Sequence, residues 1–404
     1  MFSMKIHLIK MDREIIENII IGVFSGESLN LHESFIEKAI ELKASDIHIE
    51  PIENEVLIRI RTDGKLTLDR KIKTSEYNIL LSKIKIKANM DITEKRRPQD
   101  GKYNIELYNN SYDLRVSTIP TVYGEKLVIR ILYGITFDFS LDKIHLTQKQ
   151  LKKLMKIISL KNGLVIINGP TGSGKSTTLY SILQSINNEE INITTLEDPI
   201  EVIIPGINQI SLNRNANINF ATGLKSILRQ DPDVIMIGEI RDEETASMAV
   251  RAALTGHKVY ATIHTKTPRE VYLRLDDMGV KQYFLKDSIV GIVSQRLIRT
   301  LCTKCKVYKE DIDFLGRRIS RYEKYGCIYC NNTGYKGRTM VSAVELIEGE
   351  YKEVVSNIFQ EINLLSNGEM VESLLSLLEE GKISTDDYKK FILEEGINEK
   401  LYKV

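Results

Sequence analysis

The sequence contains no tryptophan, only 8 prolines and no long apolar run. Its longest apolar stretches, such as residues 19–24, are far shorter than the ~18 consecutive residues that a membrane-spanning helix needs. The N-terminal residues also lack the apolar core and small-residue cleavage site of a secretory signal peptide. We therefore expect a cytoplasmic protein with no transmembrane segment, whose cysteines are reduced.

An excess of charge of either sign is also missing. Lys and Arg number 56 against 55 Asp and Glu, which gives a formal net charge of +1. This balance excludes a whole-chain electrostatic attraction to nucleic acid or anionic lipid, although it allows a local basic patch. We expect no nucleic-acid partner. The length of 404 residues fits two to four domains of ordinary globular composition.

Cysteine is scarce but concentrated in one place. The four cysteines, Cys302, Cys305, Cys327 and Cys330, form two C-x-x-C pairs. Paired C-x-x-C elements fit a tetrahedral Zn²⁺ site made of four thiolates. The alternatives are two disulfides, an iron–sulfur cluster or thiols that hold no ligand. Because four thiolates fill the coordination shell of zinc, such a metal would be structural and not catalytic.

The pattern of apolar residues divides the chain into two regions. Alternating residues on both sides of Asp63-Gly64 predict a β-hairpin, and residues 76–92 have helical spacing. Residues 30–135 therefore predict a small α+β domain. From residue 164 onward strands and helices alternate, which is typical of βαβ units and a mainly parallel sheet.

The second region is predicted in more detail. Short β-branched runs predict strands at 164–168, 192–196, 234–237 and 259–263. Helices are expected between them at 175–186, 220–229, 242–254 and 269–278. Residues 283–301 have the spacing of one long amphipathic helix. The C-terminal residues 350–404 are polar and helical in pattern.

A complete G-x-x-x-x-G-K-S motif follows the first of these strands and begins a helix. Its glycines allow a tight loop whose N–H groups converge on phosphates, and the helix N-terminus favours an anion. Lys175 should reach the β- and γ-phosphates of ATP, and the Ser176 hydroxyl should bind Mg²⁺. The residues expected to bind nucleotide are Gly169, Pro170, Thr171, Gly172, Ser173, Gly174, Lys175, Ser176 and Thr177.

Acidic residues end two further strands at the edge where a parallel sheet binds ligands. Glu239 follows the apolar run 234–237 and is the favoured general base, with Gly238 where an Asp is usual. Glu197 and Asp198 offer further carboxylates for water or Mg²⁺, or cap a turn before Pro199.

Two histidines flank the last of the four strands. His264 follows the strand on the nucleotide side, which favours a nucleotide-sensing role. His257 precedes the same strand, and two histidines seven residues apart need not face the same way.

Together these segments resemble the secretion ATPase superfamily of type II secretion and type IV pilus assembly, the GspE/PilB family. The resemblance runs from about residue 30 to residue 347. Its motifs are Ala44–Pro51, Pro98–Gly101, the loop at 169–177, Glu197–Glu201, Asp231–Asp233, Gly238–Asp242 and Thr255–His264. The ending Gly238-Glu239 is unusual for a generic ATPase but typical of this family.

The resemblance implies a homohexamer of two-domain subunits in which ATP binds between the two domains. Arginines expected to reach the nucleotide are Arg115 and Arg130 of the N-terminal domain and Arg229, Arg241 and Arg274 of the core. His257 and His264 belong to the family's His box. The cysteine pairs resemble the assembly branch of the family, because the retraction branch lacks them.

The resemblance also implies an α/β fold class with a RecA-like P-loop core, a PAS-like α+β domain and a small zinc-binding insertion. The expected domains are an N-terminal extension (1–29), a PAS-like domain (30–135), a linker (136–147), the RecA-like core (148–300), a Cys₄ zinc module (301–340) and a C-terminal helical region (341–404).

The function expected from these features is ATP hydrolysis that powers assembly of a type IV pilus or a type II secretion pseudopilus. ATP, Mg²⁺ and a structural Zn²⁺ are the expected ligands, and Glu239, Glu197 and Lys175 the catalytic residues. The expected partners are an inner-membrane platform protein and a membrane docking subunit, which would hold the protein peripherally at the cytoplasmic membrane. The alternatives are a nucleotide-gated scaffold with little turnover, a motor for a DNA-uptake pilus, and a nucleic-acid-translocating motor.

Overall fold

The computed structural model describes residues 26–108, 110–133, 139–213, 216–348 and 359–397. The chain divides into two compact units, residues 1–137 and 138–404, and each is described by itself. Most of the expected N-terminal extension, 1–29, lies outside the described residues. Within the described ranges, no helix has the length and apolar character needed to cross a membrane.

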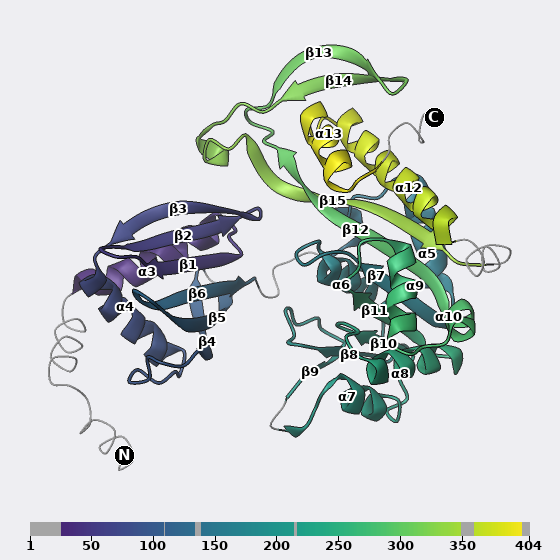
Figure 1. The fold of residues 1–404 in the computed structure, drawn as a ribbon, viewed down its shortest axis with the longest axis horizontal. Coiled ribbons are helices and arrows are strands. Elements are labelled where there is room, and N and C mark those ends of the chain that lie inside the picture. Colours follow the sequence, from purple (N-terminus) through teal and green to yellow (C-terminus); the bar gives the residue numbers. More distant parts are fainter. Residues whose placement is uncertain (1–25, 109, 134–138, 214–215, 349–358, 398–404) are drawn as a thin grey trace. The chain divides into compact units, whose positions relative to one another are not determined.

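The first unit is a sheet with helices on one face (Figure 1). Its elements are α3 (Gly26–Glu41), β1 (Asp46–Pro51), β2 (Val56–Thr62), β3 (Lys65–Ile72), α4 (Thr74–Lys87), β4 (Gln99–Leu107), β5 (Asn110–Thr121) and β6 (Gly124–Leu132). The six strands of the described part are antiparallel, in the order β3-β2-β1-β6-β5-β4. The predicted hairpin is confirmed, because Asp63 and Gly64 both have positive φ between the paired residues Thr62 and Lys65.

The alternation of residues in β1 separates an apolar face from a charged one. Ile47 and Ile49 are fully buried and lie opposite Ile60 and Ile58 of β2, in the core that α3 and α4 cover. The other face carries Asp46, His48 and Glu50, which alternate with the two isoleucines along the strand. The α+β character expected for this unit is confirmed, whereas its resemblance to PAS domains stays a prediction.

A buried ion pair ties helix α4 to strand β6. The Lys85 ammonium lies 2.6 Å from the Glu125 carboxylate, with side chains that are 1% and 5% exposed. Lys85 also donates to the carbonyl of Glu94 at 2.8 Å. The Tyr77 hydroxyl donates to the Glu125 carbonyl. The charges are thus paired and hydrogen-bonded, which burial requires.

Removal of one partner of this pair should destabilise the first unit strongly. We expect Glu125→Ala to lower the free energy of unfolding by about 3–5 kcal/mol, because it leaves the Lys85 ammonium buried and unpaired. The exposed pair Lys71–Glu55 (2.7 Å) provides the control, and Lys71→Ala should cost about 1 kcal/mol or less. Urea denaturation of both variants tests this expectation, and equal midpoints would contradict it.

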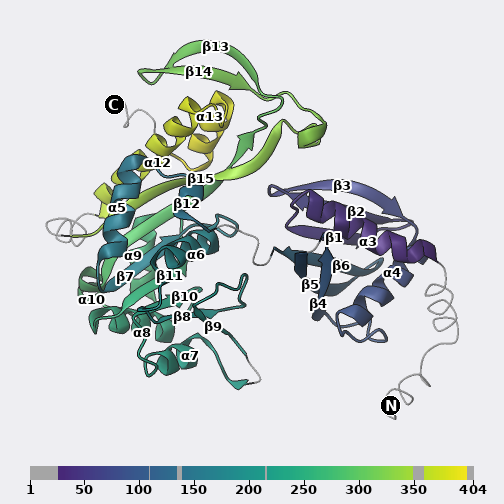
Figure 2. The same cartoon turned by 180° about the vertical axis from the view of Figure 1, so that it is seen from behind.

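The second unit is a mainly parallel sheet with helices on both faces (Figures 1 and 2). It contains η1 (Leu141–Lys143), α5 (Gln148–Ser159), β7 (Gly163–Asn168), α6 (Lys175–Ile186), β8 (Ile193–Glu197), β9 (Asn208–Ser211), α7 (Phe220–Ile227), β10 (Val234–Ile237), α8 (Glu243–Leu254), β11 (Lys258–Ile263), α9 (Pro268–Asp277), α10 (Gln282–Ser288), β12 (Ile289–Leu301), β13 (Val307–Phe314), β14 (Arg317–Glu323), η3 (Ile328–Cys330), β15 (Tyr335–Leu346), α12 (Phe359–Glu379) and α13 (Thr385–Glu394).

The large sheet has the order β15-β12-β7-β11-β10-β8-β9 among the described residues. Every neighbouring pair is parallel except β12 with β15. The four strands predicted from β-branched runs are β7, β8, β10 and β11, and the four predicted helices are α6, α7, α8 and α9, so these predictions are confirmed. Fully buried apolar side chains fill both faces of the sheet.

The helix expected over residues 283–301 is wrong. The structure has only the short helix α10 there, followed by β12, which pairs with β7 on one side and β15 on the other. A strand buried on both faces has apolar residues at nearly every position, so its pattern does not differ from that of a buried helix. A Cβ at Gly291 would lie 2.7 Å from the Ile157 side chain, so glycine allows α5 to pack closely there.

The C-terminal half of the unit extends from this sheet. The antiparallel ribbon β13–β14 lies between the two C-x-x-C pairs in sequence and projects away from the sheet (Figures 1 and 2). Strand β15 follows the second pair and returns to the sheet beside β12. Helix α12 packs against both β15 and β14. The expected zinc module ended at residue 340, but β15 continues through this residue to Leu346.

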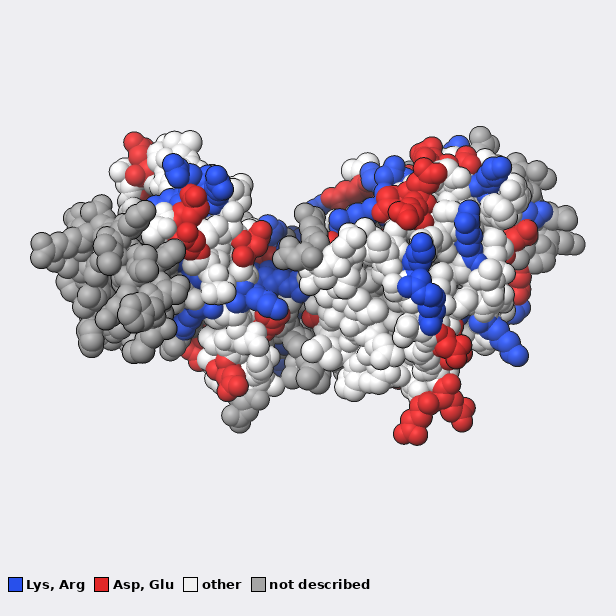
Figure 3. Space-filling view, turned by 90° about the horizontal axis from the view of Figure 1, so that it is seen from below, with Lys and Arg blue, Asp and Glu red and all other residues white. Residues whose placement is uncertain are grey.

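The surface charges agree with the balanced composition. On the face shown in Figure 3, Lys and Arg side chains alternate with Asp and Glu on each unit, and neither sign covers a whole unit.

Candidate functional site

The phosphate-binding motif forms a loop between β7 and α6, at the carboxyl end of the sheet. Gly172 and Gly174 have φ of 77° and 87°, a region that favours glycine. A Cβ at Gly169 would lie 2.5 Å from both the Gln295 carbonyl and the Ser173 hydroxyl. The glycines therefore serve both the turn and the close packing of the loop on β12.

Lys175 is buried at the start of α6, with its ammonium against the loop. The Nζ atom donates to the carbonyls of Gly169 at 2.9 Å and Pro170 at 3.0 Å. Burial lowers the pKa of Lys175, the charge of Glu239 opposes this shift, and Arg296 adds to it. The ammonium lies at the loop and can exchange these carbonyls for phosphate oxygens when an anion binds.

The loop opens onto a pocket of about 400 Å³. Nine of the residues predicted to bind nucleotide or to act in catalysis line it: Thr171, Gly172, Gly174, Lys175, Ser176, Thr177, Glu197, Glu239 and His264. Asp198, the further carboxylate after β8, is also part of its lining. The fold therefore brings these segments, which are far apart in sequence, to one place.

Glu239 follows β10 and faces this pocket. Its carboxylate pairs with the Arg241 guanidinium and lies 3.6 Å from the Nε2 atom of His264. The preceding Gly238 is crowded, because a Cβ there would lie 3.2 Å from the Leu196 carbonyl oxygen. A side chain at position 238 would therefore require the neighbouring backbone of β8 to shift by a few tenths of an ångström.

His264 lies beside Glu239, at the end of β11. Burial lowers the pKa of His264, the charges of Lys175 and Arg241 add to this effect, and Glu239 opposes it. The imidazole is therefore neutral near pH 7 and can exchange a hydrogen bond with the carboxylate or with a bound phosphate.

Glu197, at the end of β8, is buried and its carboxylate is already engaged. It accepts hydrogen bonds from the Tyr180 hydroxyl, from Thr195 at 2.6 Å and from Gln209 at 3.1 Å. Burial and the charge of Glu197 together raise the pKa of Tyr180, which keeps the phenol protonated. These three donors fix the Glu197 side chain, and its catalytic role stays a prediction.

The predicted arginines lie in different parts of the structure. Arg241 and Arg274 line a second, larger pocket beside Glu239, of about 950 Å³. Arg229 lies in neither pocket and donates to the Lys225 carbonyl at 3.0 Å. Arg115 and Arg130 lie opposite one another on β5 and β6 of the first unit, and Arg130 also pairs with Asp46 at 2.9 Å. Their contact with nucleotide stays a prediction.

The structure does not bring His257 to the pocket. The residue precedes β11, and its carbonyl accepts from Gly163, the first residue of β7. The phosphate loop follows the last residue of β7, so a six-residue strand separates the two positions. That distance is about 20 Å at 3.3 Å per residue.

Two residues to which the sequence assigned no role at the site, Thr262 and Arg338, also line the pocket, and Gln295 contacts its loop. Gln295 of β12 donates to the Ser173 carbonyl at 2.7 Å, and Thr262 of β11 donates to the Gly238 carbonyl at 2.5 Å. Arg338 of β15 is exposed and lines the pocket. The available signals were the runs Gln295–Leu297 and Gly334–Arg338, which resemble the assembly branch of the family but to which the sequence assigned no role at the site.

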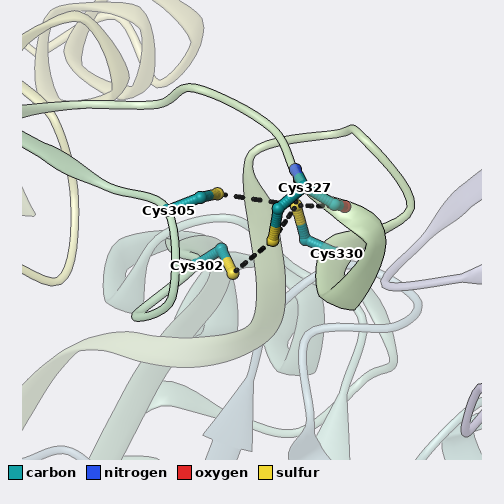
Figure 4. A group of neighbouring side chains, drawn as sticks. All are labelled: Cys302, Cys305, Cys327 and Cys330. Carbon is teal, nitrogen blue, oxygen red and sulfur yellow. Dashed lines mark hydrogen bonds between the residues drawn. The ribbon is translucent and has the colours of Figure 1, made fainter.

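The four cysteines form a second site in the same unit (Figure 4). All four sulfur atoms lie within 4.8 Å of one another, although no two are bonded. The Sγ–Sγ distances are 3.9 Å for Cys302–Cys327, 3.7 Å for Cys305–Cys330 and 3.8 Å for Cys327–Cys330. A tetrahedron of thiolates around zinc, with Zn–S bonds of about 2.3 Å, has sulfurs about 3.8 Å apart.

The surroundings of Cys330 also suit a metal ligand. The backbone N–H groups of Cys327 and Gly334 donate to its Sγ atom, each at 3.3 Å. Burial raises the pKa of Cys330, but these two donors and the neighbouring Cys305 and Cys327 side chains together lower it to about 6. The thiolate form of Cys330 is thus favoured at neutral pH, whereas burial raises the pKa of Cys305 to about 12. The four close sulfur atoms fit a structural Zn²⁺ rather than two disulfides.

Comparisons with known proteins identify a family for a chain with a phosphate-binding pocket and a four-cysteine site. A family model described as "Type II/IV secretion system protein" matches residues 26–389. The chain belongs to this family. The resemblance to secretion ATPases that the motifs indicated is therefore confirmed.

Relatives in this family are similar over most of the chain. The chain is 39% identical to type II secretion system protein E of Dickeya dadantii over 354 residues, 86% of this chain and 71% of that protein. It is 42% identical to the type IV pilus assembly ATPase PilB of Thermus thermophilus over 332 residues, 79% of this chain and 37% of that protein.

Solved structures of secretion ATPases share the fold. The ATPase DotB of Legionella pneumophila has a TM-score of 0.68 at 23% identity, over 89% of this chain and 94% of that one. The pilus retraction motor PilT with bound ADP has a TM-score of 0.61 at 24% identity, over 91% and 97%. The expected mixed α/β fold of a secretion ATPase is thus confirmed.

Proposed function

We propose that this member of the type II/IV secretion system protein family is an ATP hydrolase that powers assembly of a type IV pilus or a type II secretion pseudopilus. One observation carries the proposal. A complete phosphate loop and the Glu239 carboxylate line a single pocket at the carboxyl end of a parallel sheet. Relatives named for type II secretion and for type IV pilus assembly agree with it.

The residues of the pocket supply the groups that phosphoryl transfer to water needs. The loop N–H groups and Lys175 bind the phosphates, and the Ser176 hydroxyl would hold Mg²⁺, which neutralises phosphate charge when bound. Glu239 accepts the proton of the attacking water, because its carboxylate faces the pocket while Glu197 is occupied by three donors. Arg241 and Arg274, beside Glu239, provide positive charge for the transferring phosphoryl group.

The assembly in which the motor works is also part of the proposal. Proteins of this family act within a multi-protein secretion machinery, and a homohexamer that pushes on an inner-membrane platform protein is the arrangement we propose. The charges on the face in Figure 3 are mixed, which favours attachment through protein partners over a lipid-seeking surface.

Lys175→Ala tests the ATPase part of the proposal. We expect the variant to lose detectable phosphate release from Mg-ATP, because no other ammonium reaches the loop carbonyls among the described residues. Lys309→Ala is the control, since that lysine lies on the β13–β14 ribbon and is exposed. Phosphate release by the Lys175 variant at the wild-type rate would overturn the proposal.

Replacing the chromosomal gene by the Lys175→Ala form separates the possible machines. Loss of surface pili, loss of an exported protein or loss of DNA uptake would each identify a different filament, and wild-type levels of all three would contradict the motor role.

A further inference from the structure

Arg338 belongs to β15, the strand that follows the second C-x-x-C pair. It lines the same pocket as Lys175, Ser176 and Thr177. In the β12–β15 ladder, Arg338 lies opposite Arg299, and Met340 lies opposite Leu297. None of the motifs that indicated the phosphate loop includes this arginine.

The face of β15 that carries Arg338 contacts the start of helix α6. The Thr178 hydroxyl of α6 donates to the sulfur of Met340 at 3.7 Å. Alternate residues of a strand share a face, so Arg338, two residues before Met340, is on this face. Because Thr178 lies three residues after Lys175, Arg338 is next to the turn of α6 that receives phosphates.

Hydrogen bonds hold the backbone just before Arg338 to the cysteines and to β12. The Gly334 N–H donates to Cys330 Sγ at 3.3 Å, and the Gly334 carbonyl accepts from the Cys302 N–H at 2.9 Å. Two residues later, the Lys336 carbonyl accepts from the Thr300 hydroxyl at 2.6 Å. The backbone before Arg338 is thus held by two of the four cysteines and by the end of β12.

We propose that the cysteine knuckle (residues 302–305 and 327–334) positions Arg338 as a nucleotide-binding residue, so that metal occupancy of the knuckle and nucleotide affinity are coupled. The inference rests on the proposed function, in that the pocket must bind nucleotide. A guanidinium suits this place, because its planar set of donors binds phosphate in a bidentate manner and its face stacks on a base. Coupling of this kind is reciprocal, so nucleotide must also strengthen metal binding.

The affinity of the zinc-loaded protein for Mg-ADP, measured by titration calorimetry, is the first test. We expect Arg338→Ala to weaken ADP binding roughly ten- to a hundred-fold, the range for loss of hydrogen bonds to a charged group. Arg318→Ala is the matched control, because that arginine lies on the β13–β14 ribbon and its side chain is 85% exposed. Its ADP affinity should equal that of the wild type.

The second test measures the coupling from the side of the metal. Saturating Mg-ADP should slow the transfer of zinc from the wild-type protein to a chromogenic chelator, and this protection should disappear in Arg338→Ala. Conversely, removal of zinc should weaken ADP binding in the wild type but add little to the defect of Arg338→Ala, since both changes act through one side chain.

The outcomes separate this inference from the proposed function. A wild-type protein that binds no ADP overturns the proposed function itself. If the wild type binds ADP and Arg338→Ala binds it equally well, the role of Arg338 is overturned alone. If Arg338→Ala weakens binding but ADP protects zinc equally in both proteins, the knuckle does not act through Arg338.

Discussion

Glu239→Gln should stop ATP turnover while leaving nucleotide binding intact. An amide has the shape of the carboxylate but cannot accept a proton, so we expect kcat to fall by about 10²- to 10⁴-fold, the usual contribution of a general base. Mg-ADP affinity should stay near that of the wild type, because the loop and Lys175 supply the phosphate contacts. Steady-state phosphate release and ADP titration on the same preparation measure both quantities.

We expect the loss of turnover to depend on the position of Glu239 and not on the removal of a negative charge as such. Glu244→Gln changes a carboxylate in the first turn of α8 that is exposed and lies outside both pockets. We expect this control to retain wild-type turnover. If Glu239→Gln also retained it, the water-activating group would have to be another carboxylate, and Glu197 would be the next to test.

Loss of a single cysteine ligand should remove the metal and unfold the module around it. We expect Cys330→Ser to bind less than one equivalent of zinc per chain and to melt at a lower temperature than the wild type. The reason is that metal binding supplies folding energy to such modules, about 10–16 kcal/mol in isolated zinc fingers. Elemental analysis and thermal unfolding, with Ser320→Ala on β14 as the control, measure both effects.

The same site should release its metal in acid. Zinc binds the thiolate form, so protons compete with it as the pH falls through the pKa of the ligands. Despite burial, the N–H groups of Cys327 and Gly334 and the Cys305 and Cys327 side chains lower the pKa of Cys330 to about 6. A purified chain with the absorption of an iron–sulfur cluster, or a Cys330→Ser variant with full zinc and unchanged melting, would contradict a structural zinc site.

Local sequence patterns predicted the phosphate loop, the hairpin and the cysteine pairs, because each depends on a short segment of backbone. The loop from Gly169 to Ser176 needs glycines at fixed offsets because of its positive φ angles, and the structure has them at Gly172 and Gly174. The hairpin at Asp63-Gly64 has the same origin. Each C-x-x-C pair likewise places two sulfurs on one turn, whatever the rest of the chain does.

Long-range packing decided the remaining features. Residues 289–301 form a strand because β7 and β15 bind both of its edges, and a buried apolar run by itself does not distinguish a strand from a helix. The family's His box includes both His257 and His264, yet β11 places them at opposite ends of the sheet, with His264 at the end that the sequence favoured. Only the direction of a strand within the sheet determines which of two flanking residues faces the ligand.

The sequence by itself therefore determined that this chain has a phosphate loop, a carboxylate after an apolar strand and four paired cysteines, and which family they resemble. Only the tertiary structure decided that Glu239 faces the loop while Glu197 is held by Tyr180, Thr195 and Gln209. It also decided that Arg338 returns from the cysteines to the pocket. Motifs are set by the conformations open to a few consecutive residues, whereas these arrangements depend on which strands and helices the pairing order of the sheet brings together.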